Sequence, residues 1–202
     1  MKRLYLVLFV AFLSVGVVIA QNATLARKIL DKTASIVGRK GGASANFSIS
    51  GANYGNASGS IFIKGNKFHA RTPQAIVWFN GKTQWTYLKR TNEVNVNTPN
   101  AAQQMSMNPY HFIYLYRQGY LLGCTSLSNG YRLHLKAQRR NSSIQEMYIV
   151  VNRNYMPSQI KMRQSTKWTT IRISNFKARN LTDGVFTFKS KDFPSAEIID
   201  LR

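Results

Sequence analysis

The residue types that most often carry out catalysis are few and scattered in this sequence. After residue 20 the chain holds 7 acidic residues and 3 histidines, and their spacing matches neither an acid–base pair nor a metal site. The acidic residues are Asp31, Glu93, Glu146, Asp183, Asp192, Glu197 and Asp200, and the histidines are His69, His111 and His134. The sequence contains no nucleophile elbow, phosphate loop or dinucleotide fingerprint. We therefore expect a protein that is not an enzyme and that needs no metal ion or cofactor.

Large apolar side chains are concentrated instead on short segments. Residues 76–87 form two runs of aromatic and β-branched residues on either side of Asn80-Gly81, the dipeptide most typical of a type I′ hairpin turn. Because side chains alternate along a strand, Trp85 and Tyr87 share one face. The segment therefore predicts a β-hairpin that directs aromatic area to one side of a sheet.

Alternation of apolar and polar residues continues through most of the chain. Leu133 and Leu135, for example, alternate with Arg132, His134 and Lys136. The apolar positions of this pattern are Phe47, Ile49, Ile61, Ile63, Phe68, Tyr131, Leu133, Leu135, Ile160, Met162, Ile171, Ile173, Phe186 and Phe188. Many successive strands joined by short polar turns favour an antiparallel meander that curls into a barrel or half-barrel.

The polar positions of the same strands are strongly basic. They predict a cationic outer face made of Arg132, Lys136, Lys161, Arg163 and Arg172. The whole chain carries 28 basic and 7 acidic residues, a formal net charge of +21. Such an excess predicts an anionic partner, and for a secreted protein we favour a membrane or envelope surface over nucleic acid.

The first 20 residues predict a secretory signal. A Met-Lys-Arg start precedes an apolar run from Leu4 to Ala20, and the chain becomes polar at Gln21. We expect cleavage after Ala20, which would leave residues 21–202 as one domain with a net charge near +19. Cys124 is the only cysteine, so the fold must be stabilised by its core rather than by an intrachain disulfide.

Two regions depart from the alternating pattern. Residues 24–37 carry Leu25, Ile29, Leu30, Thr33 and Val37 at helical spacing, which predicts an amphipathic helix. Helix-compatible residues also run from 99 to 107, and a second helix is predicted to start at Asn108-Pro109 and to end at Gly119. The second of these is apolar nearly all round, so we expect the pair to pack as a lid in the mouth of the curved sheet.

At this point the sequence resembles LolA, the periplasmic lipoprotein carrier of Gram-negative bacteria. The matching features are the strand at residues 59–64 with Phe68 after it, the hairpin at 81–87, the helix start at Asn108-Pro109, and the ending at 186–188 and 197–202. Lys64 is followed by Gly65, where the family members carry an arginine that ties the barrel to its lid, so that role is not transferred.

The resemblance implies a mainly β (α+β) fold, an unclosed antiparallel β-barrel wrapped over a helical lid. It also implies a soluble, periplasmic, monomeric carrier whose apolar cavity holds lipoprotein acyl chains. Such a carrier receives its cargo from an inner-membrane ABC transporter and passes it to an outer-membrane acceptor.

An apolar cavity suits an acyl chain, because each buried methylene is worth about 0.8 kcal/mol and no directional contact is needed. The residues we expect to line it are Phe47, Ile61, Ile63, Phe68, Trp85, Tyr87, Met105, Phe112, Leu115 and Tyr116. Three other readings stay open. The protein could bind another lipid, or an anionic polymer through its cationic face, and more remotely it could act as an enzyme on a hydrophobic substrate.

Overall fold

A single twelve-stranded sheet organises the part of the chain that the computed structural model describes, residues 22–51, 55–100, 103–104 and 114–202. The strand order is β12-β6-β5-β4-β3-β2-β1-β11-β10-β9-β8-β7. The strands are β1 (Ala43–Gly51), β2 (Gly55–Lys64), β3 (Lys67–Arg71), β4 (Ala75–Phe79), β5 (Gln84–Leu88), β6 (Glu93–Asn97), β7 (Tyr120–Leu127), β8 (Gly130–Ala137), β9 (Glu146–Asn152), β10 (Pro157–Gln164), β11 (Lys167–Ala178) and β12 (Glu197–Asp200).

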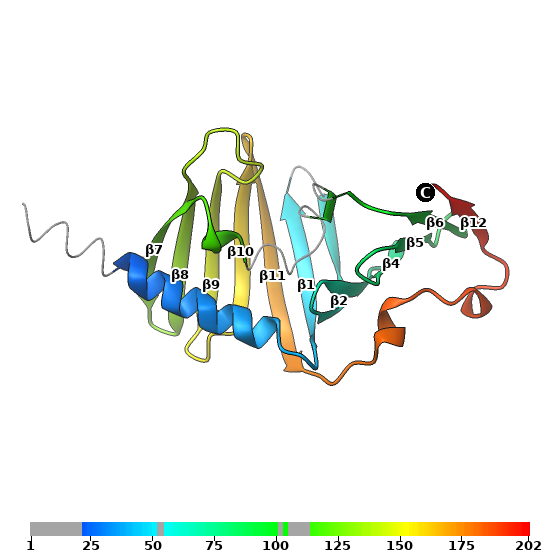
Figure 1. Cartoon of the computed structure of the whole chain (residues 1–202), viewed down its shortest axis with the longest axis horizontal. Coiled ribbons are helices and arrows are strands. Elements are labelled where there is room, and N and C mark those ends of the chain that lie inside the picture. Colours follow the sequence, from blue (N-terminus) through cyan, green and yellow to red (C-terminus); the bar gives the residue numbers. More distant parts are fainter. Residues whose placement is uncertain (1–21, 52–54, 101–102, 105–113) are drawn as a thin grey trace, which may run out of the picture.

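Two meanders build this sheet, and they meet where β1 pairs with β11. Every neighbouring pair is antiparallel except β12 and β6, which are parallel. The two end strands, β12 and β7, do not pair with each other, so the sheet is curved but unclosed (Figure 1). The predicted half-barrel is therefore confirmed.

An N-terminal helix over residues 22–37 crosses the half of the sheet formed by β7 to β11 (Figure 1). Ala26, Leu30, Ala34 and Val37 recur every three or four residues and are at most 2 % exposed. They pack in one cluster with the apolar residues of β8, β9 and β10. Leu25, predicted on the buried face, is instead 43 % exposed.

A strap of residues 181–196 leads from β11 to β12 and covers part of the other face of the sheet. It contains two short 3₁₀ turns, η2 (Asp183–Phe186) and η3 (Ser190–Asp192). The expected strand alternation at Phe186 and Phe188 is therefore wrong, because η2 ends at Phe186 and residues 187–189 form no strand. Lys64 and Lys67 pair with Asp183 at 3.1 and 2.9 Å and hold the start of the strap against the β2–β3 turn.

The hairpin predicted at residues 76–87 is present as β4 and β5, but its turn is not of type I′. Only Gly81 has a positive φ, 98°, and the Asn80 side-chain oxygen accepts hydrogen bonds from the backbone N–H groups of Lys82 and Thr83. Asparagine stabilises the turn with its side chain rather than with a left-handed backbone.

Most of the predicted helical lid, including residues 105–113, lies outside the described residues. The described part shows a capping box, in which the backbone N–H groups of Asn100 and Gln103 each donate to the other residue's side-chain oxygen. Where the description resumes, η1 (Leu115–Arg117) is a 3₁₀ turn that leads into β7.

Candidate apolar binding site

A cavity of about 170 Å³ lies on the concave face, at the junction of the two meanders. It is lined by the end of the N-terminal helix and by β1, β2, β3, β10 and β11. The lining residues are Val37, Ala43, Ser44, Ala45, Asn46, Phe47, Ile49, Ile61, Ile63, Phe68, Ala70, Pro157, Ile160, Ile171, Ile173 and Phe176.

Strand register explains why apolar side chains converge here. Residues that face each other on antiparallel strands point to the same side of the sheet. Phe47 lies opposite Ile173, and Ile63 lies opposite Phe68. The alternation in the sequence thus becomes a continuous apolar surface across the strands that line the cavity.

The cavity separates two parts of the hydrophobic core. One cluster joins the N-terminal helix to β8–β10, and the other joins β1 to β4. Ile173 and Phe176 are only partly buried and contact both clusters. The core is therefore incompletely packed at this junction, which leaves room for a guest with apolar groups.

Among the described residues that line the cavity, none is acidic, basic or a histidine. Binding there would depend on the removal of apolar surface from water and not on charge or on a directional hydrogen bond. Elsewhere in the described ranges, no group of three or more His, Cys, Asp or Glu residues is placed to hold a metal ion.

Four of the residues predicted to line the cavity do so: Phe47, Ile61, Ile63 and Phe68. Leu115 and Tyr116 instead pack against the core under the N-terminal helix. Met105 and Phe112 lie outside the described residues.

Trp85 and Tyr87 need a correction, because they lie on the opposite face of the sheet. Phe79, whose side chain packs with Phe68 on the cavity side, pairs with Gln84, so the next residue, Trp85, points away. The outer face is not bare there: the Tyr87 and Phe193 ring centroids are 4.6 Å apart. The Tyr87 ring of β5 is therefore covered by the strap.

The sequence analysis missed the cavity residues of β10 and β11 as site residues, although their alternation was recognised. Ile160, Ile171 and Ile173 have the same spacing as the residues that were chosen. Only the pairing of β1 with β11 reveals that these strands complete the wall.

The segment before β7 is tied to the N-terminal helix by two tyrosines. Tyr114 donates a hydrogen bond to the Ala34 carbonyl at 3.2 Å, and Tyr116 donates one to the Asp31 carboxylate. Burial, with the bond to Asp31 as a further cause, raises the pKa of the Tyr116 hydroxyl. On the other side of the helix, Lys32 lies 4.4 Å from the centre of the Tyr155 ring. These contacts hold the helix over the sheet next to the cavity.

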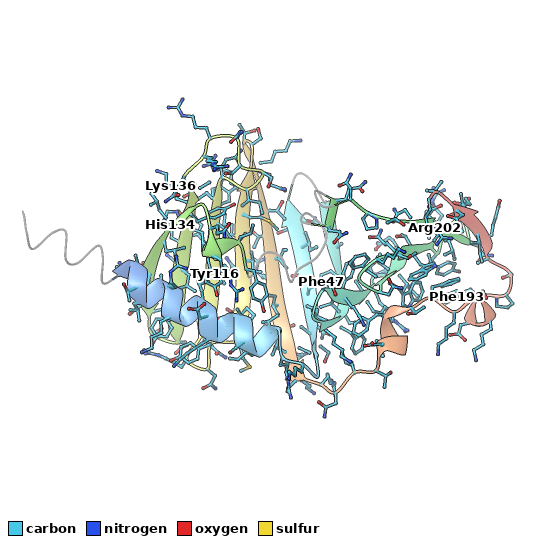
Figure 2. All side chains as sticks on the ribbon, viewed as in Figure 1. Phe47, Tyr116, His134, Lys136, Phe193 and Arg202 are labelled. Atoms are coloured by element: carbon cyan, nitrogen blue, oxygen red, sulfur yellow. The ribbon has the colours of Figure 1, made fainter. Side chains whose placement is uncertain are left out.

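The outer face of the same half-sheet carries the predicted cationic residues. Lys136 and Arg163 both lie opposite Glu146, and Arg172 lies opposite Gln159. Arg132 follows the same alternation as Lys136 along β8. All four side chains therefore point away from the cavity. Figure 2 labels Lys136 and His134 on β8. Lys161 lies 4.7 Å from the centre of the Trp168 ring, a cation–π contact that leaves its charge at the surface.

Glu146 is the carboxylate of this face. Partial burial would by itself raise its pKa, but hydrogen bonds from Tyr148, His134 and Arg163 together lower it. The Glu146 carboxylate is 2.9 Å from His134 Nε2 and 3.2 Å from Arg163 Nη2. Among the described residues, the other basic side chains of this face form no ion pair with a carboxylate, so most of the positive charge stays available to a partner.

The described helices include none that is long and apolar enough to cross a membrane. The predicted signal at residues 1–20 lies outside the described ranges, so its cleavage remains a prediction.

Comparison with known proteins places these features in a family. Residues 16–166 match the family described as outer membrane lipoprotein carrier protein LolA. This match covers most of the chain but ends before β11 and the strap. No curated protein matches the sequence.

Solved structures are similar to this chain at low sequence identity. An uncharacterized conserved protein from Thermus thermophilus is 15 % identical, with a TM-score of 0.58 over 87 % of this chain and 98 % of that one. A LolA superfamily protein from Nitrosomonas europaea is also 15 % identical, with a TM-score of 0.43 over 81 % of this chain and 97 % of that one. A putative outer membrane lipoprotein-sorting protein domain from Vibrio parahaemolyticus is 10 % identical, with a TM-score of 0.43 over 85 % and 97 % of the two chains.

Proposed function

Since the chain belongs to the family of LolA outer membrane lipoprotein carrier proteins, we propose that it binds lipoprotein acyl chains in the apolar cavity. The observation that carries this proposal is the uncharged cavity lining at the junction of two core clusters. An acyl chain has the matching chemistry, because its affinity grows with each buried methylene.

The cavity must widen to hold a whole acyl chain. Its volume of about 170 Å³ is smaller than the roughly 300–1,000 Å³ of pockets that enclose drug-sized ligands. The strands of its wall are hydrogen bonded on both sides, whereas Val37 comes from the end of a helix that rests on the sheet through side chains. We expect the helix end to move away from β1 and β11 when a chain enters.

The transport role follows the family. The carrier would take lipoproteins from an inner-membrane ABC transporter and deliver them to an outer-membrane acceptor across the periplasm, without hydrolysing anything itself. For this it must hold the acyl chains less tightly than the acceptor does. A signal at residues 1–20 would bring it to that compartment.

Two neighbouring residues of β1 provide a matched test. Phe47 lines the cavity, whereas Ser48 points to the outer face opposite Arg172. We would titrate the Phe47→Asp and Ser48→Asp variants with a fluorescent fatty acid and displace it with a triacylated lipopeptide. Phe47→Asp should lower the affinity at least tenfold, because a carboxylate in the cavity loses its hydration, and Ser48→Asp should bind like the unchanged protein.

Equal binding by both variants would contradict the cavity as the acyl site. Loss of binding in both would show a folding defect, which circular dichroism would detect. Mass spectrometry of the protein purified without detergent from a Gram-negative periplasm should also find co-purifying lipoprotein.

The cationic outer face supports a second role in the same process, docking on anionic membrane surfaces. The observation that favours it is a row of basic side chains on β8, β10 and β11 that all point away from the cavity. The same face would serve the alternative partner, an anionic envelope polymer. Acyl-chain binding should change little with salt, whereas binding through this face should weaken steeply.

A further inference from the structure

A second cavity, of about 540 Å³, lies on the opposite face of the sheet from the acyl-chain cavity. Its floor is formed by the outward side chains of β2, β3 and β4, and its wall by the strap. Its volume lies within the range of about 300–1,000 Å³ that is typical of small-molecule sites. Half of the enclosure comes from residues 184–193, which follow the part of the chain that matches the family.

The strap is held at both ends, so the cavity belongs to the folded chain. At one end Lys64 also donates to the Leu181 carbonyl at 2.8 Å, in addition to its ion pair with Asp183. At the other end Asn92 donates to the Ser195 carbonyl at 2.7 Å, and β12 then pairs with β6. Between these points the strap spans the outer face of the sheet, and Figure 2 labels Phe193 on it.

The apolar part of the cavity is aromatic. Trp78 stacks on His69 with ring centroids 5.2 Å apart, and the rings of Phe193 and Trp78 are nearly perpendicular with centroids 5.5 Å apart. Phe62 completes the aromatic lining. These rings suit a flat apolar group more than a flexible chain, because ring faces and edges give defined contact geometries.

The polar part presents hydrogen-bond donors. Arg71 Nε donates to His69 Nε2 at 3.1 Å, which leaves the proton of the neutral imidazole on Nδ1. His69 is 4 % exposed, and its Nδ1 is fully buried next to the Val185 backbone. The imidazole therefore orients the Arg71 side chain, and the donors open to a ligand are those of the exposed Arg71 guanidinium.

The charged residues at the cavity opening also favour an anionic ligand. Arg71 and Lys189 are exposed at the opening, with Asp192 as the single acid among the lining residues. The remaining N–H groups of the Arg71 guanidinium, and the Lys189 ammonium, have no hydrogen-bond partner in the described ranges. Burial and the nearby Arg71 charge lower the pKa of His69 to about 4, with the Val185 backbone acting in the other direction, so the imidazole is a neutral donor at pH 7.

We propose that this cavity is a second ligand site, for a small organic anion that joins an aromatic ring to a phosphate or carboxylate group. The ring would lie against Trp78 and Phe193. The anionic group would accept hydrogen bonds from the Arg71 guanidinium, with Lys189 adding positive charge. This site is independent of the acyl-chain cavity, since the sheet separates the two.

Calorimetric titration with 1-naphthyl phosphate tests the proposal, with inorganic phosphate and 1-naphthol as the two halves of the probe. The intact probe should bind at least tenfold more tightly than either half. Arg71→Gln and Lys189→Gln should each weaken it several-fold or more, while Arg90→Gln, an exposed arginine in the β5–β6 turn, should leave it unchanged.

The acyl-chain variant separates the two sites. Phe47→Asp should leave naphthyl phosphate binding unchanged, and a fatty acid should not compete with the probe. Binding that is insensitive to both Arg71→Gln and Lys189→Gln, or that a fatty acid displaces, would overturn the proposal. Equal affinity for 1-naphthol and its phosphate would overturn the anionic part of it.

Discussion

The hydroxyl group of Tyr116 donates a hydrogen bond to the carboxylate of Asp31, and so joins the segment before β7 to the N-terminal helix. Tyr116 is 1 % exposed, whereas Asp31 lies at the surface. The bond therefore holds the helix against the core that it covers, beside the cavity that the helix end helps to close. A helix held by few polar contacts can move without breaking the sheet.

The Tyr116→Phe variant should lose about 1–2 kcal/mol of unfolding free energy, because it loses a hydrogen bond to a charged acceptor. The loss should be moderate, since Asp31 is exposed and water can hydrate its carboxylate in the variant. The raised pKa of Tyr116 adds a pH signature. Its contribution should be complete below pH 10 and should decline at higher pH, where the unfolded tyrosine ionises first. Urea unfolding at pH 7 to 10.5 measures both effects.

Tyr131→Phe is the matched control, since it removes a tyrosine hydroxyl from the same half of the sheet. A loss of stability as large as that of Tyr116→Phe would argue against a specific role for the bond to Asp31. If the helix end opens for cargo, Tyr116→Phe should also speed the uptake of a fluorescent fatty acid.

His69 predicts an acid-dependent loss of stability. Its pKa of about 4 in the folded protein lies below the ordinary value of 6.5, so the unfolded chain binds a proton first as the pH falls. The stability that depends on neutral His69 is complete above pH 6.5 and is lost as the pH falls towards 4. We expect a loss of about 2 kcal/mol between pH 7 and pH 5, in addition to the effect of other groups.

The His69→Phe variant should remove this slope, because phenylalanine preserves the stacking on Trp78 but does not titrate. Urea unfolding at pH 7, 6 and 5 gives the measurement, and His134→Gln, at a half-exposed histidine of the outer face, serves as the control. The same slope in His69→Phe as in the unchanged protein would show that other groups cause it.

The strands of one half of the sheet were predictable because one of their faces is solvated. In β8, apolar Leu133 and Leu135 alternate with basic residues, so the pattern itself indicates which side chains point inward. In β4, by contrast, the consecutive residues Trp78 and Phe79 point to opposite faces, yet both are apolar and at most 6 % exposed. When both faces of a strand are covered, alternation carries no information about direction, and the assignment of Trp85 and Tyr87 was wrong for this reason.

The strap could not be predicted for a different reason. The alternation at Phe186 and Phe188 indicated a strand, but the segment forms two 3₁₀ turns. Its contacts join distant parts of the chain, as in the ring pair of Tyr87 and Phe193. The second cavity depends on that cover. His69 looked like an isolated histidine in the sequence, and only the fold places it under the strap beside Arg71.

The cationic outer face predicts salt-dependent membrane binding. Lys161 and Arg172 are exposed on it, and each basic residue near an anionic bilayer contributes about 1 kcal/mol. The double variant Lys161→Gln, Arg172→Gln should therefore bind vesicles of anionic lipid roughly 30-fold more weakly. Arg90→Gln together with Lys82→Gln, two exposed basic residues in turns on the other half of the sheet, is the matched control.

Vesicle sedimentation at 50 and 300 mM salt gives the measurement. Neutral vesicles should not retain the protein, and the higher salt should weaken binding to anionic ones. An equal loss in the two double variants would mean that net charge, and not the outer face of β10 and β11, directs the protein to the bilayer.

Two strand glycines should respond in opposite ways to the same substitution. A Cβ atom added at Gly59 would lie 1.9 Å from the Arg71 carbonyl oxygen and 3.3 Å from the ring of Phe47. Backbone oxygen cannot rotate away, so β2 and β3 would have to separate, and Gly59→Ala should cost about 1–3 kcal/mol or more.

At Gly123 the nearest atom to an added Cβ is 3.7 Å away. Gly123→Ala should be neutral or stabilising, because alanine restricts the unfolded chain. Urea unfolding of both variants, with the fluorescent fatty acid as a second readout, tests this contrast: only Gly59→Ala should weaken probe binding, since only Gly59 contacts a residue that lines the cavity.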